Sequence, residues 1–366
     1  MQTAIPQADA PQTSAVYRFE FRGTAAEYFK IWLANTALTV LTLGVYSAWA
    51  KVRAKRYFYA NTFLHGANFE YHAKPLSILI ARLVIFTVVI GGGVWAAEKG
   101  ADEDAAYSLA IFLVFLPWAW ARGLSFNARN SSYRNVRFSF RRAYGFPYLF
   151  NFILLTPFNI LFLPWLMRGY HQYKSERHQW GKLRFIFRRP PVPPQAGNFS
   201  ARDTFDSPPV LPYMAIFWLA PVVLFAAASV LIGWGISAPS GEYAFAYFAA
   251  AILLALLFIF KARARMFLLF WNGVRSENGA VFYCDFSARE FAYRILLVNF
   301  FAAWLSLGLL HPWAKVRKTR FLAERVRIFA PSGVLENVFA RQGESENALG
   351  EEAFAAEGFD FDVGIV

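Results

Sequence analysis

Tryptophan and basic residues stand together twice in this chain, in the pentapeptide WAKVR at 49–53 and again at 313–317. Each copy follows an apolar stretch, and a further arginine comes three residues after it. Tryptophan prefers the headgroup level of a membrane, and lysine and arginine beside it attract phosphate and other anionic groups. The sequence therefore predicts two surfaces that bind or organise anionic lipid or another envelope component, made of Trp49, Lys51, Arg53 and Arg56 and of Trp313, Lys315, Arg317 and Arg320.

These residues also have a simpler interpretation. Each pentapeptide could act only as an interfacial anchor, in which the indole sets the depth of a short helix and the cations stay in the headgroup layer. The residue pattern favours this interpretation and leaves the specific lipid site open.

A second polar set lies inside apolar stretches. Asn35, Asn151 and Asn299 each precede a tryptophan by 14 residues, at Trp49, Trp165 and Trp313. A fixed spacing in three places indicates an internal repeat. Asparagine at membrane depth usually links helices through hydrogen bonds. Alternatively, the three could converge as a polar ring in a transporter or channel for a small solute.

Long apolar stretches must position these side chains. Of the 366 residues, 57% are hydrophobic and only 17% are charged, which is unusual for a soluble chain. Four stretches approach the length that spans a membrane, at 76–97, 105–121, 212–234 and 243–260, and three weaker ones lie at 29–48, 147–167 and 291–311. Alternating aromatic residues precede the weaker stretches, as in Phe19 and Phe21, and predict short extended segments. We therefore expect an all-α integral membrane protein with internal repeats, transmembrane hairpins, re-entrant or interfacial helices and short extended cytoplasmic segments.

The distribution of lysine and arginine predicts the topology. Only the loops at 98–104 and 236–242 lack a basic excess, so 76–121 and 212–260 are expected to form hairpins with their tips outside the cell. Basic residues flank all three weaker stretches on both sides, which favours re-entry from the cytoplasmic face over an ordinary seven-span arrangement. The first 16 residues have no apolar core of a signal peptide, and both termini are expected in the cytoplasm.

Composition also divides the chain. The predicted parts are a disordered N-terminus at 1–16, a first membrane half at 17–187, a proline-rich linker at 188–211, a second membrane half at 212–331 and an acidic tail at 332–366.

Catalytic patterns are weak. His171 and His178 would share one helical face, but no cysteine or carboxylate at close spacing completes a metal site. Cys284 is the only cysteine, so the chain has no internal disulfide. We expect no enzyme activity, cofactor or metal, with a novel membrane enzyme as a remote alternative. The net charge of +13 is attributed to contact with anionic membrane lipids rather than with nucleic acid.

One motif resembles a known family. The run N-x-x-L-T-x-x-T-L-G-x-Y-x-x-W-A-K-V-R-x-x-R-Y at 35–57, with Asn61, Thr62, Gly66 and F-x-Y at 69–71, is similar to the YjgN family of bacterial inner-membrane proteins. The resemblance covers roughly residues 17–330. The copy at 299–317 is similar, whereas the middle copy departs, with Met167 and Gly169 where lysine and arginine would stand. The resemblance implies a multi-pass inner-membrane location and carries no reaction and no assigned site residues.

Overall fold

A ring of ten short antiparallel strands forms the base of the molecule. The computed structural model describes residues 14–87, 91, 102–154, 156, 159–188, 209–237 and 244–331. The strands close into a barrel in the order β1-β10-β9-β8-β7-β6-β5-β4-β3-β2. Their bounds are β1 (Ser14–Phe21), β2 (Thr62–Leu64), β3 (Ala67–Tyr71), β4 (Ser131–Tyr133), β5 (Val136–Phe140), β6 (His178–Trp180), β7 (Leu183–Phe187), β8 (Val274–Ser276), β9 (Val281–Cys284) and β10 (Val326–Pro331).

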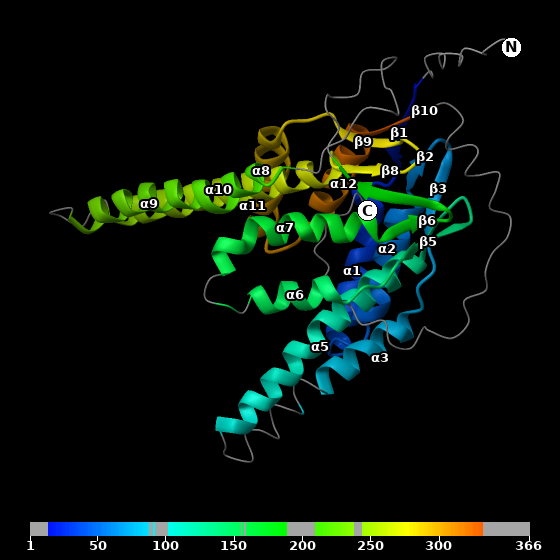
Figure 1. Ribbon diagram of the computed structural model, residues 1–366, viewed down its shortest axis with the longest axis horizontal. Helices are drawn as coiled ribbons and strands as arrows, with labels where there is room; N and C mark the ends of the chain where they lie inside the picture. The colour runs from blue at the N-terminus through cyan, green and yellow to red at the C-terminus, as the bar shows by residue number, and fades with distance from the viewer. Residues whose placement is uncertain are drawn as a thin grey trace, which may run out of the picture.

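The helices lie between consecutive hairpins of this ring. They are α1 (Ala25–Leu41), α2 (Ser47–Ala60), α3 (Pro75–Phe86), α5 (Asp102–Arg129), α6 (Gly145–Leu154), α7 (Asn159–Glu176), α8 (Leu211–Met214), the π-helix η2 (Ala215–Leu219), α9 (Ala220–Ser237), α10 (Ala244–Trp271), the π-helix η3 (Glu290–Leu297), α11 (Val298–Leu305) and α12 (His311–Arg325). In the described residues the same order, a strand, an outgoing helix, a returning helix and a strand, occurs five times. The helix pairs project from one side of the ring (Figure 1).

Local sequence explains the two kinds of turn. Two hairpins use the positive φ angles of a type I′ turn, 46° at His65 with 78° at Gly66, and 49° at Arg134 with 64° at Asn135. The α1–α2 and α11–α12 turns pass through Gly44 (φ 92°) and Gly308 (φ 91°), where a residue without a Cβ is needed. The sequence predicts that the helix formed by each apolar stretch breaks near Gly44 or Gly308, and the structure has both breaks.

Aromatic side chains fill the ring. Tyr17 and Phe19 of β1 are buried, as are Tyr133 and Trp180. Phe69 connects them, with ring centroids 6.2 Å from Phe19 and 4.7 Å from Tyr133. Large aromatics at alternate positions leave the barrel packed with side chains, as expected for inward-facing strand positions.

The prediction of an all-α fold is wrong, because the ten strands form a closed barrel. The segments expected to be merely extended pair with one another, for example Phe21 with Thr62 and Val16 with Phe329. Several strands have only three residues and pair with partners remote in sequence, so they carry too short an alternating pattern to predict a sheet.

The prediction of membrane hairpins needs a second correction. By length and composition, two helical stretches in the described part of the chain could span a membrane, Leu211–Trp234 and Phe245–Trp271, and few of their residues are buried. They match the predicted hairpin at 212–260. In the described part of 76–121, Pro75–Val84 is a shorter apolar helix and the 28-residue helix α5 runs through 105–121, while the turn between them lies outside the described residues. The N-terminus predicted to be disordered, most of the predicted linker and the predicted acidic tail lie largely outside the described residues.

Candidate functional site

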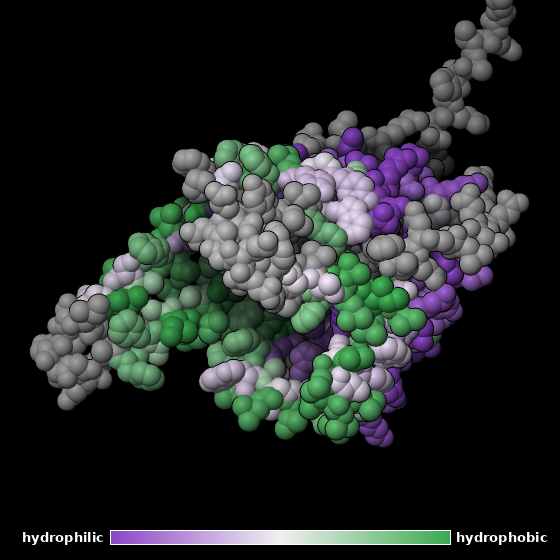
Figure 2. Space-filling model, turned by 90° about the horizontal axis from the view of Figure 1, so that it is seen from below, coloured by the Kyte–Doolittle hydropathy of each residue, from purple (hydrophilic) through white to green (hydrophobic). Residues whose placement is uncertain are grey.

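The turns between the paired helices expose apolar side chains. Leu43 and Leu307 are each 95% exposed, although each is a leucine beside a glycine at a tight turn. Other exposed apolar residues surround them, namely Val40, Leu41, Val45, Trp304, Leu305, Leu309 and Leu310. In Figure 2 the hydrophobic residues cover the projecting helices, and hydrophilic residues gather at the opposite end, where the strands lie. Apolar surface of this kind marks contact with lipid or with another protein.

Next to one of these tips, α12 forms a pocket. Trp313, Arg317, Arg320 and Glu324 follow one another at intervals of four, three and four residues, which places them in one stripe along the helix. They line a pocket of about 310 Å³, together with Ala25 at the start of α1, Ile295 of η3 and two apolar residues of α12, Val316 and Phe321. The structure thus brings three of the predicted anion-binding residues together.

The cations of α12 are held in different ways. Arg317 donates from Nη1 to Oδ1 of Asn299 over 3.1 Å, and its guanidinium carbon lies 5.1 Å from the Trp313 ring centroid. Arg320 donates from Nη2 to the carbonyl of Gly23 over 2.9 Å. Lys315 is not a lining residue of the pocket, and its Nζ lies 4.6 Å from the ring centroid of Phe58.

The equivalent face of α2 is more open. Trp49 stacks on Tyr46, with ring centroids 6.1 Å apart. Arg53 is exposed and forms no hydrogen bond or ion pair within the described part of the chain. Arg56 donates to the carbonyls of Tyr71 (3.3 Å) and Ala73 (3.1 Å). Lys51 is half-buried.

Arg56 and Arg320 connect each helix pair to the next one around the ring. Arg56 of the α1–α2 pair holds the segment after β3, and Arg320 of the α11–α12 pair holds the corresponding segment after β1, two residues beyond each strand at Ala73 and Gly23. Sequence analysis missed this role, although both arginines stand seven residues after the repeated tryptophan. The repeated seven-residue spacing between the tryptophan and the arginine was the sequence signal that could have indicated this role.

Two of the three predicted asparagines link helices within their own pair. Asn35 donates from Nδ2 to the carbonyl of Ala50 over 3.3 Å, and Asn299 donates in the same way to Ala314 over 2.9 Å. The Asn299 oxygen also accepts from Arg317, whereas Oδ1 of Asn35 is buried and has no hydrogen-bond partner among the described residues. Asn151 is half-buried in α6. Because each of these contacts lies within its own helix pair, Asn35 and Asn299 act as links between helices. This is the simpler of the two predicted roles, the other being a shared polar ring.

The histidines and the cysteine are structural. His171 is buried and shares a hydrogen bond of 2.8 Å between Nδ1 and the Tyr213 hydroxyl. Burial, with Lys174 nearby as a second cause, lowers the pKa of His171 to about 3. The Nδ1 of His178 contacts the Lys174 carbonyl, and Cys284 is buried. Within the described residues no three His, Cys, Asp or Glu side chains gather as a metal site. The expectation of no enzyme activity stays a prediction.

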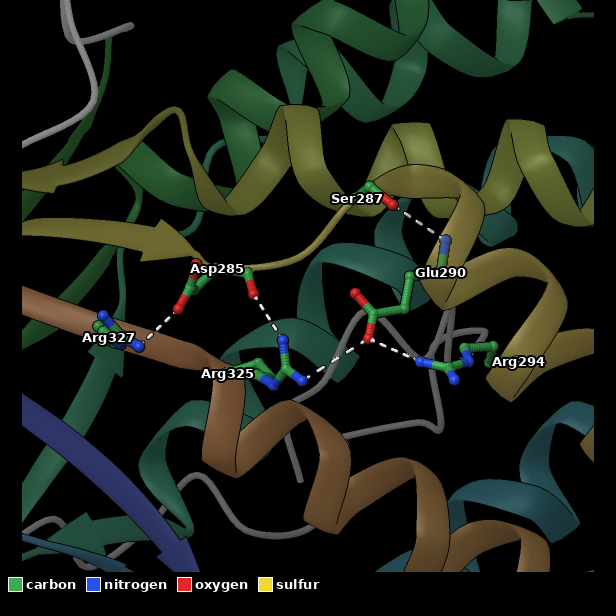
Figure 3. Close-up of polar contacts among 6 residues, drawn as sticks. All are labelled: Asp285, Ser287, Glu290, Arg294, Arg325 and Arg327. Atoms are coloured by element: carbon green, nitrogen blue, oxygen red, sulfur yellow. Dashed lines mark hydrogen bonds and ion pairs between the residues drawn. The ribbon is translucent and has the colours of Figure 1, made fainter.

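An ion-pair network at the foot of α12 was also missed. Arg325 reaches Glu290 over 3.6 Å and donates to the Asp285 carbonyl over 3.2 Å, and Arg327 pairs with the Asp285 carboxylate (Figure 3). Glu290 also lies 3.7 Å from Arg294. The network joins η3, which carries the pocket residue Ile295, to the junction of α12 and β10. It therefore holds this wall of the pocket in place at the end nearer the strands. Apart from Glu290 and Arg294, which are four residues apart, the pairs in the network join residues 35 to 42 positions apart, and nothing in the sequence pairs them.

These features define a class of protein. A closed strand ring carries paired helices with exposed apolar tips, and tryptophan and arginine lie between the tips and the ring, as in a protein attached to a membrane. The chain belongs to the family described as bacterial proteins of unknown function, DUF898, which it matches over residues 16–356.

Curated relatives carry the name inner membrane protein YjgN. The chain is 35% identical over 142 residues to that of Escherichia coli O157:H7, covering 38% of this chain and 34% of the relative. It is 30% identical over 145 residues to that of Salmonella typhimurium, covering 38% and 36%. The chain thus spans about a third of the length of the curated relatives it matches. No solved structure matches.

Proposed function

We propose that the chain is a bacterial inner-membrane protein that holds phospholipid at the cytoplasmic face, with the tryptophan and arginine residues of α2 and α12 against the lipid phosphates. One observation carries the proposal: all five helix pairs in the described chain start and end at the same strand ring, and the tips of the α1–α2 and α11–α12 pairs expose apolar side chains. Helix pairs arranged in this way insert from one side. The YjgN relatives, named as inner-membrane proteins, support the location.

Helix length separates two kinds of insertion. At about 1.5 Å per residue, the 17 residues of α1 extend about 26 Å, less than the hydrocarbon thickness of about 30 Å, and part of α1 lies beside the ring. The α1–α2 and α11–α12 pairs therefore enter and return. The helical stretches Leu211–Trp234, of 24 residues, and Phe245–Trp271, of 27 residues, extend about 36 and 40 Å, enough for the α9–α10 pair to cross. The strand ring and both ends of the described chain then lie on one side, since Ser14 pairs with Pro331.

The cytoplasmic side is favoured by charge. Exposed arginines line the strands, among them Arg18, Arg137 and Arg184, and cytoplasmic surfaces carry such an excess. Once the apolar tips are in the lipid, Arg53 and Arg317 lie about one helical turn nearer the ring than Trp49 and Trp313, at the level of the phosphates.

Cysteine labelling tests the insertion. We expect a cysteine at the exposed ring position Glu20 to react with an impermeant maleimide in inverted vesicles and not in intact spheroplasts. Cysteines replacing Leu43 or Leu307 should react from neither side and only after detergent is added. Native Cys284 is buried and gives the background signal. Labelling of the Leu43→Cys variant in intact spheroplasts would show that the first helix pair crosses the membrane, and the proposal would fail.

Bound lipid tests the binding itself. Arg53→Gln should weaken retention of anionic lipid by about 1 kcal/mol, less at high salt, because one cation near the headgroups is lost. Arg18→Gln, at an exposed position of β1, is the matched control, because it loses the same charge away from the inserted helices. Native mass spectrometry of the purified protein at two salt concentrations measures both. Equal anionic lipid on the wild type and Arg53→Gln would remove α2 from the proposal.

A further inference from the structure

The pocket on α12 contains both signs of charge. Arg317 and Arg320 line its middle, and Glu324 lines its end nearer the ring. A guanidinium has five N–H donors. Arg317 uses one on Asn299 and Arg320 uses one on Gly23, so each retains donors for a bound anion. Paired guanidinium groups suit the oxygens of a phosphate.

Glu324 makes the pocket unsuitable for a purely anionic headgroup. Its carboxylate is exposed and forms no hydrogen bond or ion pair within the described part of the chain. The neighbouring Arg325 is committed to Glu290 and to the Asp285 carbonyl (Figure 3). An acceptor-only carboxylate beside a phosphate site repels a second negative charge and suits a cation such as a primary ammonium.

The residues occur along α12 in the order of the parts of a phospholipid. Trp313 is nearest the apolar tip, Arg317 and Arg320 follow at about 6 and 10 Å along the axis, and Glu324 follows at about 16 Å. The apolar wall formed by Ile295 and Val316 lies beside the arginines. A lipid whose chains lie toward the tip places its phosphate at the arginines and the group esterified to that phosphate at Glu324.

We propose that this pocket selects a phospholipid with an ethanolamine headgroup, with the phosphate at Arg317 and Arg320 and the ammonium at Glu324. The inference rests on the proposed function, because it requires the tip of the α11–α12 pair to lie in the lipid. Helix α2 provides a comparison within the same chain: Trp49, Arg53 and Arg56 match the α12 stripe, but Ala60 stands where α12 has Glu324. The α2 face therefore binds the lipid phosphate without distinguishing the group that is esterified to it.

The test compares two lipids on the full-length protein. Wild-type protein, Glu324→Gln and Ala60→Glu are placed in nanodiscs of equal phosphatidylethanolamine and phosphatidylglycerol, extracted into mild detergent, and their bound lipids counted by native mass spectrometry. We expect Glu324→Gln to lower the ratio of ethanolamine to glycerol lipid about fivefold, equivalent to about 1 kcal/mol. Ala60→Glu, at an exposed helix end, should raise the same ratio.

Each outcome decides a separate point. Retained lipid with an unchanged ratio in both variants overturns the headgroup selection and leaves the proposed function standing. No retained lipid on the wild type overturns the proposed function itself. If Glu324→Gln fails to fold, the Ala60→Glu ratio and the conservative Glu324→Asp, expected to keep the wild-type ratio, decide the matter.

Discussion

Replacing each of the two linking asparagines by alanine should give unequal losses of stability. Asn299 forms two hydrogen bonds, one to the Ala314 carbonyl and one from the charged Arg317. Asn35 forms only the equivalent bond to Ala50, and its Oδ1 is buried and has no hydrogen-bond partner in the described part of the chain. The same substitution thus removes different sets of contacts at two corresponding positions.

The expected difference follows from the kinds of bond. A neutral hydrogen bond contributes about 1 kcal/mol, and one from a charged donor about 1.5–3 kcal/mol. Asn299→Ala should therefore lower the free energy of unfolding by about 2.5–4 kcal/mol. Asn35→Ala should cost about 0–1 kcal/mol, because removing the unpartnered oxygen offsets the lost bond.

Unfolding by sodium dodecyl sulfate in mixed micelles, followed by circular dichroism, measures both changes. A double-mutant cycle also uses the single variant Arg317→Ala and the double variant that combines it with Asn299→Ala. The coupling free energy between the two residues should be close to that of one charged hydrogen bond. Equal losses for the two asparagine variants, or no coupling, would refute the contact pattern on which the argument rests.

Three further predictions concern the ring, the histidine and a helix turn. Arg320→Gln should lower the free energy of unfolding by about 1.5–3 kcal/mol because it loses the hydrogen bond to the Gly23 carbonyl, whereas Arg53→Gln should change it by no more than about 0.5 kcal/mol. Unfolding in denaturant compares the two variants, and equal values would contradict the linking role of Arg320. The pKa of His171 is about 3 in the folded protein and near 6.5 in the unfolded chain, so between these values only the unfolded state binds the extra proton. The free energy of unfolding should therefore drop by about 1.4 kcal/mol for each pH unit below about 6.5, until pH 3. This pH dependence should be shallower in thermal melts of His171→Gln. Gly308→Ala should lower the free energy of unfolding by about 1–2 kcal/mol, because alanine is strained at a φ of 91°. Gly233→Ala is the control: an added Cβ has no atom within 4 Å at either glycine, and this substitution should not destabilise the protein. An unchanged melting temperature for Gly308→Ala would show that the turn relaxes.

The sequence predicted the parts of this fold better than their assembly. Phe19 and Phe21, expected in an extended segment, lie in β1, and the expected helix breaks occur at Gly44 and Gly308. Their local chemistry is sufficient: alternating aromatics favour a strand, and glycine permits positive φ. The closure of the ring was not predictable in this way, because β2 has three residues and pairs with β1 across two helices.

The candidate site shows the same division. The sequence predicted one surface of Trp313, Lys315, Arg317 and Arg320, and the structure places three of them, without Lys315, in one pocket. Glu324 was missed, since a lone carboxylate near a helix end has no pattern until Arg325 is seen to be committed elsewhere. The atoms that accept from Arg56 and Arg320 are backbone carbonyls, which have no signature in the side-chain sequence.

The strand ring explains how short helix pairs can remain inserted. Burying one exposed leucine in lipid gains about 1.5–3 kcal/mol, so a tip with several such residues favours insertion, but a single short pair has to order its chain in return. The ring orders all five pairs together, and Arg56 and Arg320 fix neighbouring pairs to each other. Because the tips enter as one unit, their small gains add without five separate ordering costs. If the tips are inserted as proposed, the depth is set where Trp49 and Trp313 end and the guanidinium groups begin, and the pocket of α12 then lies in the headgroup layer.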